Sequence, residues 1–170
     1  MGAIMSLCLG LVWSDAALSA NTSPAASAAR VAAVSSDQRP WSWPTGGPVA
    51  VSRAFDPPDQ PWLSGHRGVD LDVPVGAVVV SPADGVVVYA GLVADREVVS
   101  VEIDGVRATF EPVSPRVRRG DRVVRGQELG VVLPGHVPGG LHWGVRVDRK
   151  SYVNPLGFLS SRVVLKPWDG

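Results

Sequence analysis

Short apolar runs, many of them built on two or three successive valines, alternate with clusters of turn-forming residues from position 49 to position 148. Valine and the other β-branched residues favour extended strands, whereas Gly, Pro and Asp favour the turns between strands. The pattern therefore predicts a series of short strands. The predicted strands are Val49–Ala54, Val69–Val73, Ala77–Val80, Gly85–Gly91, Glu97–Ile103, Val106–Phe110, Arg122–Val124, Glu128–Leu133 and His142–Asp148.

The residues between these strands indicate antiparallel pairing. Asp104-Gly105 alone separates two of the strands, which predicts a tight hairpin. Pro82-Ala83-Asp84-Gly85 is a second strong turn signal. No stretch has the apolar period of an amphipathic helix, and the chain has no internal repeat. We therefore expect an all-β domain, an antiparallel sandwich or barrel.

The 170 residues are enough for one domain with additional tails. Residues 1–20 resemble an export signal, because the apolar run Ile4–Trp13 precedes small residues suited to cleavage, although no basic residue precedes that run. A disordered apolar tail is the alternative. Residues 21–38 are rich in Ala and Ser and predict a flexible linker; residues 39–165 form the predicted domain and 166–170 a tail. We expect a secreted or cell-envelope protein without a transmembrane segment in its mature chain.

Charge and cysteine content narrow the possible partners and sites. Lys+Arg and Asp+Glu number 16 each, so the net charge is zero and no nucleic-acid partner is expected. Cys8 is the only cysteine, which excludes an intrachain disulfide and a cysteine-rich zinc site. A metal site must therefore use His, Asp or Glu. We expect a monomer.

Two of the three histidines lie in informative places. His66 and Asp70 are four residues apart, which on a straight strand is about 13 Å, too far to share a metal ion with bonds of about 2 Å. The chain must therefore bend between them, and Gly68 makes such a bend easy. His142 alternates with Gly144 on one face of its strand, and the glycine leaves room for a ligand. Each signal alone is weak, because a lone His is more often a polar residue with ordinary partners.

The order of these residues, together with the glycine-containing turns between them, resembles the M23 family of zinc metallopeptidases. These lysostaphin- and LytM-like enzymes cut peptide cross-links in bacterial peptidoglycan, and the forms found here look most like exported actinobacterial members. The resemblance covers about Trp43 to Leu159. It rests on His66-Arg-Gly-Val-Asp70, Pro74-Val-Gly76, Ala83-Asp-Gly85, Val117–Gly130, Leu141-His142-Trp143 and Asn154-Pro155.

The resemblance implies that His66, Asp70 and His142 are ligands of one Zn²⁺ ion and that the substrate is a peptidoglycan peptide. Two His and one carboxylate leave a coordination position open, as in catalytic rather than structural zinc sites.

Two further family histidines, which assist the reaction without binding zinc, are missing. Gly140 and Pro112 stand at their positions. One positioned acid–base group contributes about 10²–10⁴-fold to the rate, so this loss could abolish most activity. His136, in a glycine-rich loop, could fold back over the metal and assist, or it could be an exposed loop residue. Glu111 could act as a base, although a solvated carboxylate is favoured.

The missing histidines leave two functions open. The first is a zinc endopeptidase that acts on peptidoglycan cross-links. The second is a degenerate LytM-like module that binds the cell wall or regulates a cell-wall hydrolase.

Three other features of the sequence have alternative interpretations. The arginines of 116–125 are interpreted as solvated edge and turn positions, or as a contact for anionic wall polymers. The tryptophans at 41, 43 and 62 could stack on a substrate or cover the core. The run Val117–Gly130 also resembles biotinyl carrier domains, but no lysine lies in a suitable hairpin, which excludes that interpretation.

Overall fold

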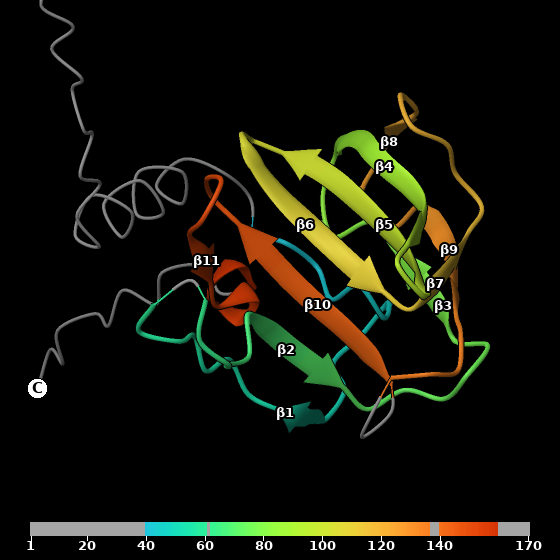
Figure 1. Ribbon diagram of the computed structural model, residues 1–170. Helices are drawn as coiled ribbons and strands as arrows, with labels where there is room; N and C mark the ends of the chain where they lie inside the picture. The colour runs from blue at the N-terminus through green and yellow to red at the C-terminus, as the bar shows by residue number, and fades with distance from the viewer. Residues whose placement is uncertain (1–39, 61, 137–139, 160–170) are drawn as a thin grey trace, which may run out of the picture.

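The computed structural model describes residues 40–60, 62–136 and 140–159. The predicted export signal, the linker, the end of the predicted domain beyond residue 159 and the tail lie outside the described residues. Figure 1 shows two antiparallel sheets, one large and one small. This arrangement confirms the all-β prediction. Within the described residues the helical structure is one short 3₁₀ turn, η1 (Pro155–Phe158), and no helix there is long and apolar enough to cross a membrane.

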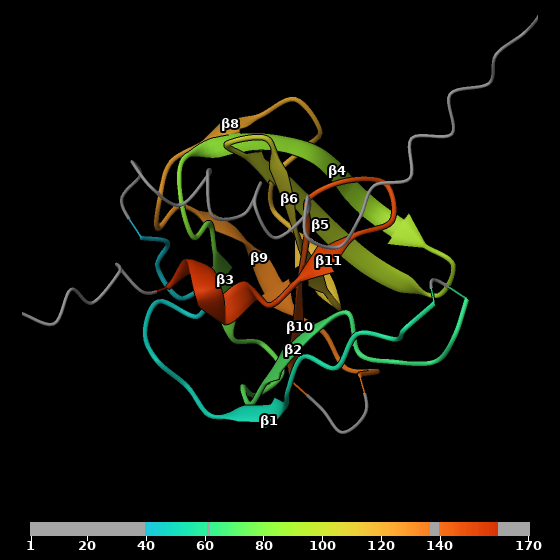
Figure 2. The same ribbon diagram turned by 90° about the vertical axis from the view of Figure 1, so that its left-hand side faces the viewer.

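The large sheet carries the site. Its strands pair in the order β1-β2-β10-β6-β5-β4-β8, and β11 pairs with β10. Their bounds are β1 Val51–Arg53, β2 Gly68–Leu71, β4 Gly85–Val93, β5 Arg96–Ile103, β6 Val106–Glu111, β8 Arg122–Val123, β10 Leu141–Arg146 and β11 Tyr152–Val153. The small sheet has the order β3-β9-β7, with β3 Val78–Val80, β9 Glu128–Val132 and β7 Val113–Pro115. In the turned view the small sheet lies to one side of the large one (Figure 2).

The predicted strands are all present with shifted ends, but β7 and β11 were missed. Strand β7 has three residues, ends on Pro115 and follows Pro112, and proline argues against a strand. Strand β11 has two residues. Both are held in place by a neighbouring strand, which sequence alone does not reveal. The predicted hairpin at Asp104-Gly105 is present, and both residues have positive φ, of 51° and 79°, as a type I′ turn requires.

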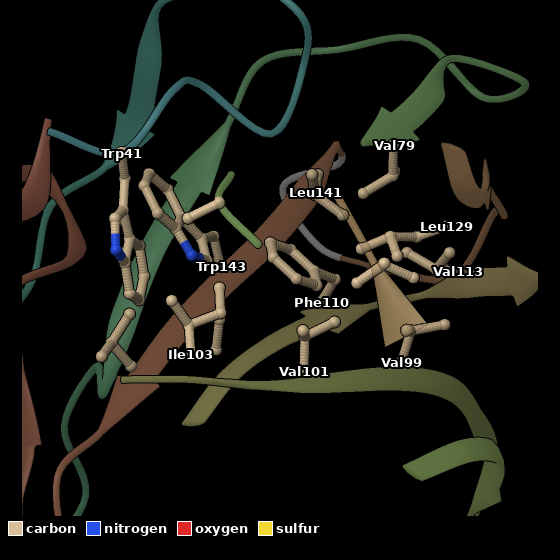
Figure 3. Close-up of a cluster of buried hydrophobic side chains, with 14 of the residues drawn as sticks. Trp41, Val79, Val99, Val101, Ile103, Phe110, Val113, Leu129, Leu141 and Trp143 are labelled. Atoms are coloured by element: carbon tan, nitrogen blue, oxygen red, sulfur yellow. The ribbon is translucent and has the colours of Figure 1, made fainter. Parts of the chain in front are cut away.

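The core lies between the two sheets (Figure 3). Phe110 and Trp143, from the inner face of the large sheet, are fully buried, as are Val79, Val113 and Leu129 of the small sheet. Each such side chain contributes about 1.5–3 kcal/mol by leaving water. Trp41 covers one end of this core, where its ring stacks on Phe158 at 4.4 Å between centroids. Trp41 therefore belongs to the core and the partly buried Trp43 packs against it, whereas Trp62 is 78% exposed.

Candidate metal centre

The outer face of β2 and β10, opposite the core, brings Asp70 and His142 together. These two residues are directly opposite one another in the antiparallel register of the strands. Their neighbours Val69, Leu71, Leu141 and Trp143 point the other way and are fully buried. Strand alternation thus places the two polar side chains on one face, and the tightly packed inner face fixes the backbone beneath them.

His66 reaches the same face from outside the regular sheet. It forms an isolated bridge with Asp56, with backbone hydrogen bonds of 2.9 and 2.6 Å between the two residues. The predicted bend between His66 and Asp70 is present and lies at Arg67, before β2 begins.

Gly68 has a different role from the one expected. Its φ is not positive, so the bend does not use its special freedom. A Cβ at this position would lie 2.4 Å from the carbonyl oxygen of Trp143 and 2.6 Å from Nε2 of His142. Only glycine therefore lets β2 approach β10 closely enough to leave space for the His142 ring.

Three nitrogen and oxygen atoms converge at the centre of this arrangement. Oδ1 of Asp70 lies 2.9 Å from Nε2 of His66 and 2.8 Å from Nδ1 of His142. The two ring nitrogens are themselves 3.1 Å apart. His66 and Asp70 are buried, with 5% and 0% of their surfaces exposed. This is the only group of three potential metal-ligating side chains found among the described residues.

The ring orientation of His66 tests whether a cation fits. Its Nδ1 lies 2.6 Å from the carbonyl oxygen of Ala54, an acceptor, so Nδ1 carries the proton and donates it. In the neutral ring, Nε2 then has a lone pair that faces the lone pairs of Asp70 Oδ1. Either a second proton on His66 or a cation must lie between these atoms. The other carboxylate oxygen of Asp70 is buried without a hydrogen-bond partner, which also suits a cation. Two imidazoles and one carboxylate are a donor set that zinc accepts, and the Ala54 carbonyl orients the first of them.

The electrostatics keep this donor set ready for a cation. Burial raises the pKa of the Asp70 carboxyl, but the hydrogen bond with His142 and the charges of His136, His142 and His66 outweigh burial, so the pKa lies below its usual value. Burial lowers the pKa of His142, and nearby His66 adds to this effect, although Asp70 and Glu111 oppose it. Asp70 is therefore ionised and His142 neutral near pH 7, which are the protonation states of metal ligands.

His136 lies beside the centre rather than in solvent. Its side chain is 9% exposed, and its Nε2 is 3.0 Å from Oδ1 of Asp70. The alternative of an exposed loop histidine is therefore wrong. Neither ring nitrogen of His136 has a partner with hydrogen-bond geometry, so both are available to bind a ligand or to exchange a proton.

The two positions of the missing family histidines are filled in different ways. A Cβ at Gly140, where φ is 90°, would lie 2.0 Å from the carbonyl oxygen of Leu71. The missing side chain of this glycine therefore allows close contact with the end of β2. Pro112 is buried, and its carbonyl oxygen accepts a hydrogen bond from the amide of Leu133. Glu111, opposite His142 in the register, is paired with Arg96 at 3.6 Å and is 26% exposed, so it is not a freely solvated carboxylate.

A groove of about 570 Å³ continues from His142 across the outer face of the large sheet. Gly144, Thr109 and Ser100 form part of its lining, and the two hydroxyl groups hydrogen-bond to each other at 3.0 Å. Farther along, Arg107 and Arg146 line it. This pair was not predicted from the sequence, although alternation along the predicted strands places both residues on the same face as His142. The arginines at 116–125 are all exposed, as expected.

Known proteins resemble this chain in sequence and in fold. The chain is 42% identical over 135 residues to the uncharacterized protein Rv2891 of Mycobacterium tuberculosis, covering 74% of this chain and 54% of that protein. It is 30% identical over 127 residues to the murein hydrolase activator NlpD of Salmonella typhimurium, covering 72% of this chain and 32% of NlpD. The chain thus spans about half the length, or less, of these curated relatives.

The catalytic domain of the antimicrobial peptidase lysostaphin from Staphylococcus simulans superposes with a TM-score of 0.54 at 25% identity. The match covers 66% of this chain and 93% of that domain. The sequence pattern of peptidase family M23 matches residues 64–155, which include His66, Asp70 and His142. The match spans more than half of the chain, and the chain therefore belongs to peptidase family M23.

Proposed function

We propose that this chain is an exported zinc peptidase that hydrolyses peptide cross-links of peptidoglycan. The observation that carries the proposal is the convergence of His66, Asp70 and His142 on one point, with the His66 ring already oriented by the Ala54 carbonyl. Such preorganisation is typical of metal centres, whose ligands are fixed by groups behind them. Membership of family M23 supports the same reaction class.

In this proposal the three side chains hold the ion and leave one side of it facing the groove. Zinc, when bound, would polarise the scissile carbonyl and lower the pKa of water. The groove on the β10 face positions an extended peptide across the centre, because Gly144, which has no side chain, leaves room for the peptide beside His142. The buried Asp70 contributes the negative charge that retains the cation.

His136 takes the part of the missing helper histidine in this proposal. Its Nε2 lies within 3.0 Å of Asp70 Oδ1, and both ring nitrogens lack hydrogen-bond partners. A neutral imidazole in that place could accept a proton from water and return it to the leaving amine. Replacing His136 should then lower the rate by about 10²-fold while zinc stays bound.

The test combines zinc content with wall digestion. The full chain, purified with zinc, should contain about one equivalent and release peptide fragments from purified cell walls. His142→Ala should lose both the metal and the digestion, whereas His136→Gln should keep the metal and lose most of the digestion. Zinc-loaded wild type that releases no fragments across a range of pH would refute the peptidase.

A matched pair of carboxylates provides the control. Asp70 is buried at the centre, whereas Asp72, two residues later, is exposed. Asp70→Asn should lose zinc and digestion, while Asp72→Asn should keep both. If the two variants behave alike, the centre assigned here is not where the metal binds.

A second function, a module that binds the cell wall or regulates a cell-wall hydrolase, is favoured by one observation. The backbone contact of Gly140 with Leu71 closes the position of the first helper histidine, and Pro112 occupies the second. NlpD, a relative of this chain in sequence, is named a murein hydrolase activator. This function predicts that zinc-loaded chain binds cell walls or increases the digestion caused by a purified wall hydrolase, without releasing fragments itself.

A further inference from the structure

Positive charge is concentrated in the groove although the chain as a whole is neutral. The lining of the groove includes four arginines, Arg67, Arg107, Arg119 and Arg146, but one carboxylate, Glu111. Over the full sequence, basic and acidic residues balance at 16 each. Glu111 is already paired with Arg96, which lies outside the lining. The lining of the groove therefore has an excess of positive charge, which favours a negatively charged ligand.

Arg107 and Arg146 form the most unusual part of the lining. They are directly opposite one another on β6 and β10, an arrangement in which like charges repel. Neither forms a salt bridge with any carboxylate among the residues that the structure describes. The Nε atom of Arg107 is buried and has no hydrogen-bond partner. Glu102 is its neighbour on β5 but is exposed and forms no ion pair with it.

An unpaired, partly buried guanidinium costs free energy unless a ligand satisfies it. Two adjacent guanidinium groups present several N–H donors in planar forks, a geometry that matches a carboxylate. The small residues between the pair and the metal centre leave room for a peptide backbone rather than for a bulky group.

We propose that Arg107 and Arg146 form a subsite for a carboxylate of an acidic peptide that lies along the groove. The proposal deepens the function proposed above and rests on it for the direction of the peptide. Arg146 is four residues from His142 on β10, which is about 13 Å. An extended peptide spans that distance with about four residues. The bound carboxylate therefore lies up to about four residues from the bond held at the metal centre, and the subsite selects peptides that keep this carboxylate free.

The test measures binding by the metal-free full chain, so that it does not depend on hydrolysis. The probes are a peptidoglycan stem tetrapeptide with free carboxylates and the same tetrapeptide with its carboxylates converted to amides. The wild type should bind the acid about tenfold more tightly than the amide, and this preference should shrink with added salt. Arg107→Gln combined with Arg146→Gln should abolish the preference by weakening binding of the acid alone.

Arg122→Gln is the matched control, because this exposed arginine lies on β8 outside the groove. It should leave the preference unchanged. Folding of the double variant is checked by its melting temperature, which should equal or slightly exceed that of the wild type, because the variant lacks the repulsion between two opposed cations.

Several outcomes would overturn the subsite. Equal binding of acid and amide by the wild type is one, and equal loss of binding in Arg122→Gln is another. Equally strong competition by glycerol 3-phosphate would show a general anion site rather than a carboxylate subsite. Binding of a wall hydrolase without any peptide binding would assign the groove to a protein partner. If the zinc-loaded chain still digests walls in any of these cases, the proposed peptidase stands and only the subsite fails.

Discussion

The carboxylate of Asp70 has three imidazole rings around one of its oxygens, at 2.8 to 3.0 Å. Such crowding of nitrogen atoms around a buried oxygen is stable only when protons or a cation lie between them. At this scale the chain's chemistry depends on which ring carries which proton. The Ala54 carbonyl accepts a hydrogen bond from Nδ1 of His66 and so determines which nitrogen of that ring is protonated. Burial lowers the pKa of His142 and favours its neutral ring.

Protonation of this centre should make the metal-free chain less stable in acid. The pKa of His142 is below its usual 6.5 in the folded chain, so the unfolded chain binds more protons as the pH falls below about 6.5. The pKa of Asp70 is likewise below 3.8, which adds a second loss of stability below that pH. Urea midpoints measured with a chelator should therefore fall from pH 7.5 to pH 5, and His142→Gln should flatten this part of the curve. An unchanged slope in the variant would contradict the assignment.

Gly68→Ala should damage the centre although it removes no ligand. The added Cβ would meet the Trp143 carbonyl and the His142 ring, so β2 and β10 must separate or the ring must turn. We expect a loss of about 1–3 kcal/mol in the free energy of unfolding and at least a tenfold loss in zinc affinity. Gly157→Ala, where a Cβ meets no atom within 4 Å, should change neither quantity appreciably. Denaturant unfolding and competition with a zinc chelator measure both.

At the scale of the element, the site depends on how strands β2 and β10 meet. The register that aligns Asp70 with His142 also packs the start of β10 against the end of β2, where Gly140 contacts the Leu71 backbone. This close approach excludes a side chain from the position of one helper histidine.

Restoring that histidine should therefore fail. Gly140→His would force a Cβ to within 2.0 Å of the Leu71 carbonyl in a backbone conformation that only glycine adopts readily. We expect a destabilisation of about 2–4 kcal/mol and no gain in wall digestion. A variant as stable as the wild type with faster digestion would show that the strand can yield, and that the helper is missing for another reason.

At the scale of the whole molecule, the large sheet presents one face to the core and the other to the groove. The core face is apolar, and its side chains join one cluster that runs from Trp41, before β1, to Val79 and Leu129 of the small sheet (Figure 3). The groove face carries the candidate metal ligands on β2 and β10 and, farther along β10 and β6, the arginine pair. A rigid floor of this kind keeps both sites in a fixed relation to each other.

Zinc binding should stabilise the whole domain, because the ligands come from separate parts of the chain that unfolding disperses. At a free zinc concentration of 100 times the dissociation constant, the gain is about 2.7 kcal/mol. For a domain of this size it corresponds to a rise in melting temperature of about 10 °C. Magnesium, which requires octahedral oxygen ligands, should give no such rise. The rise should disappear in Asp70→Asn, and its persistence there would place the metal elsewhere.

The sequence by itself determined the strands, the Asp104-Gly105 hairpin and the family, because valine runs, turn residues and ordered motifs are local signals. Alternation within one strand also predicted that His142 points to the face opposite the one on which Trp143 is buried. Only the tertiary structure decided what lies between strands. The Ala54 carbonyl behind His66, the space that Gly68 leaves, the burial of His136 and the opposed pair Arg107 and Arg146 all arise from contacts between segments distant in the chain. These contacts depend on the register of paired strands and on how closely neighbouring segments approach each other. Neither can be predicted from the residues of a single segment.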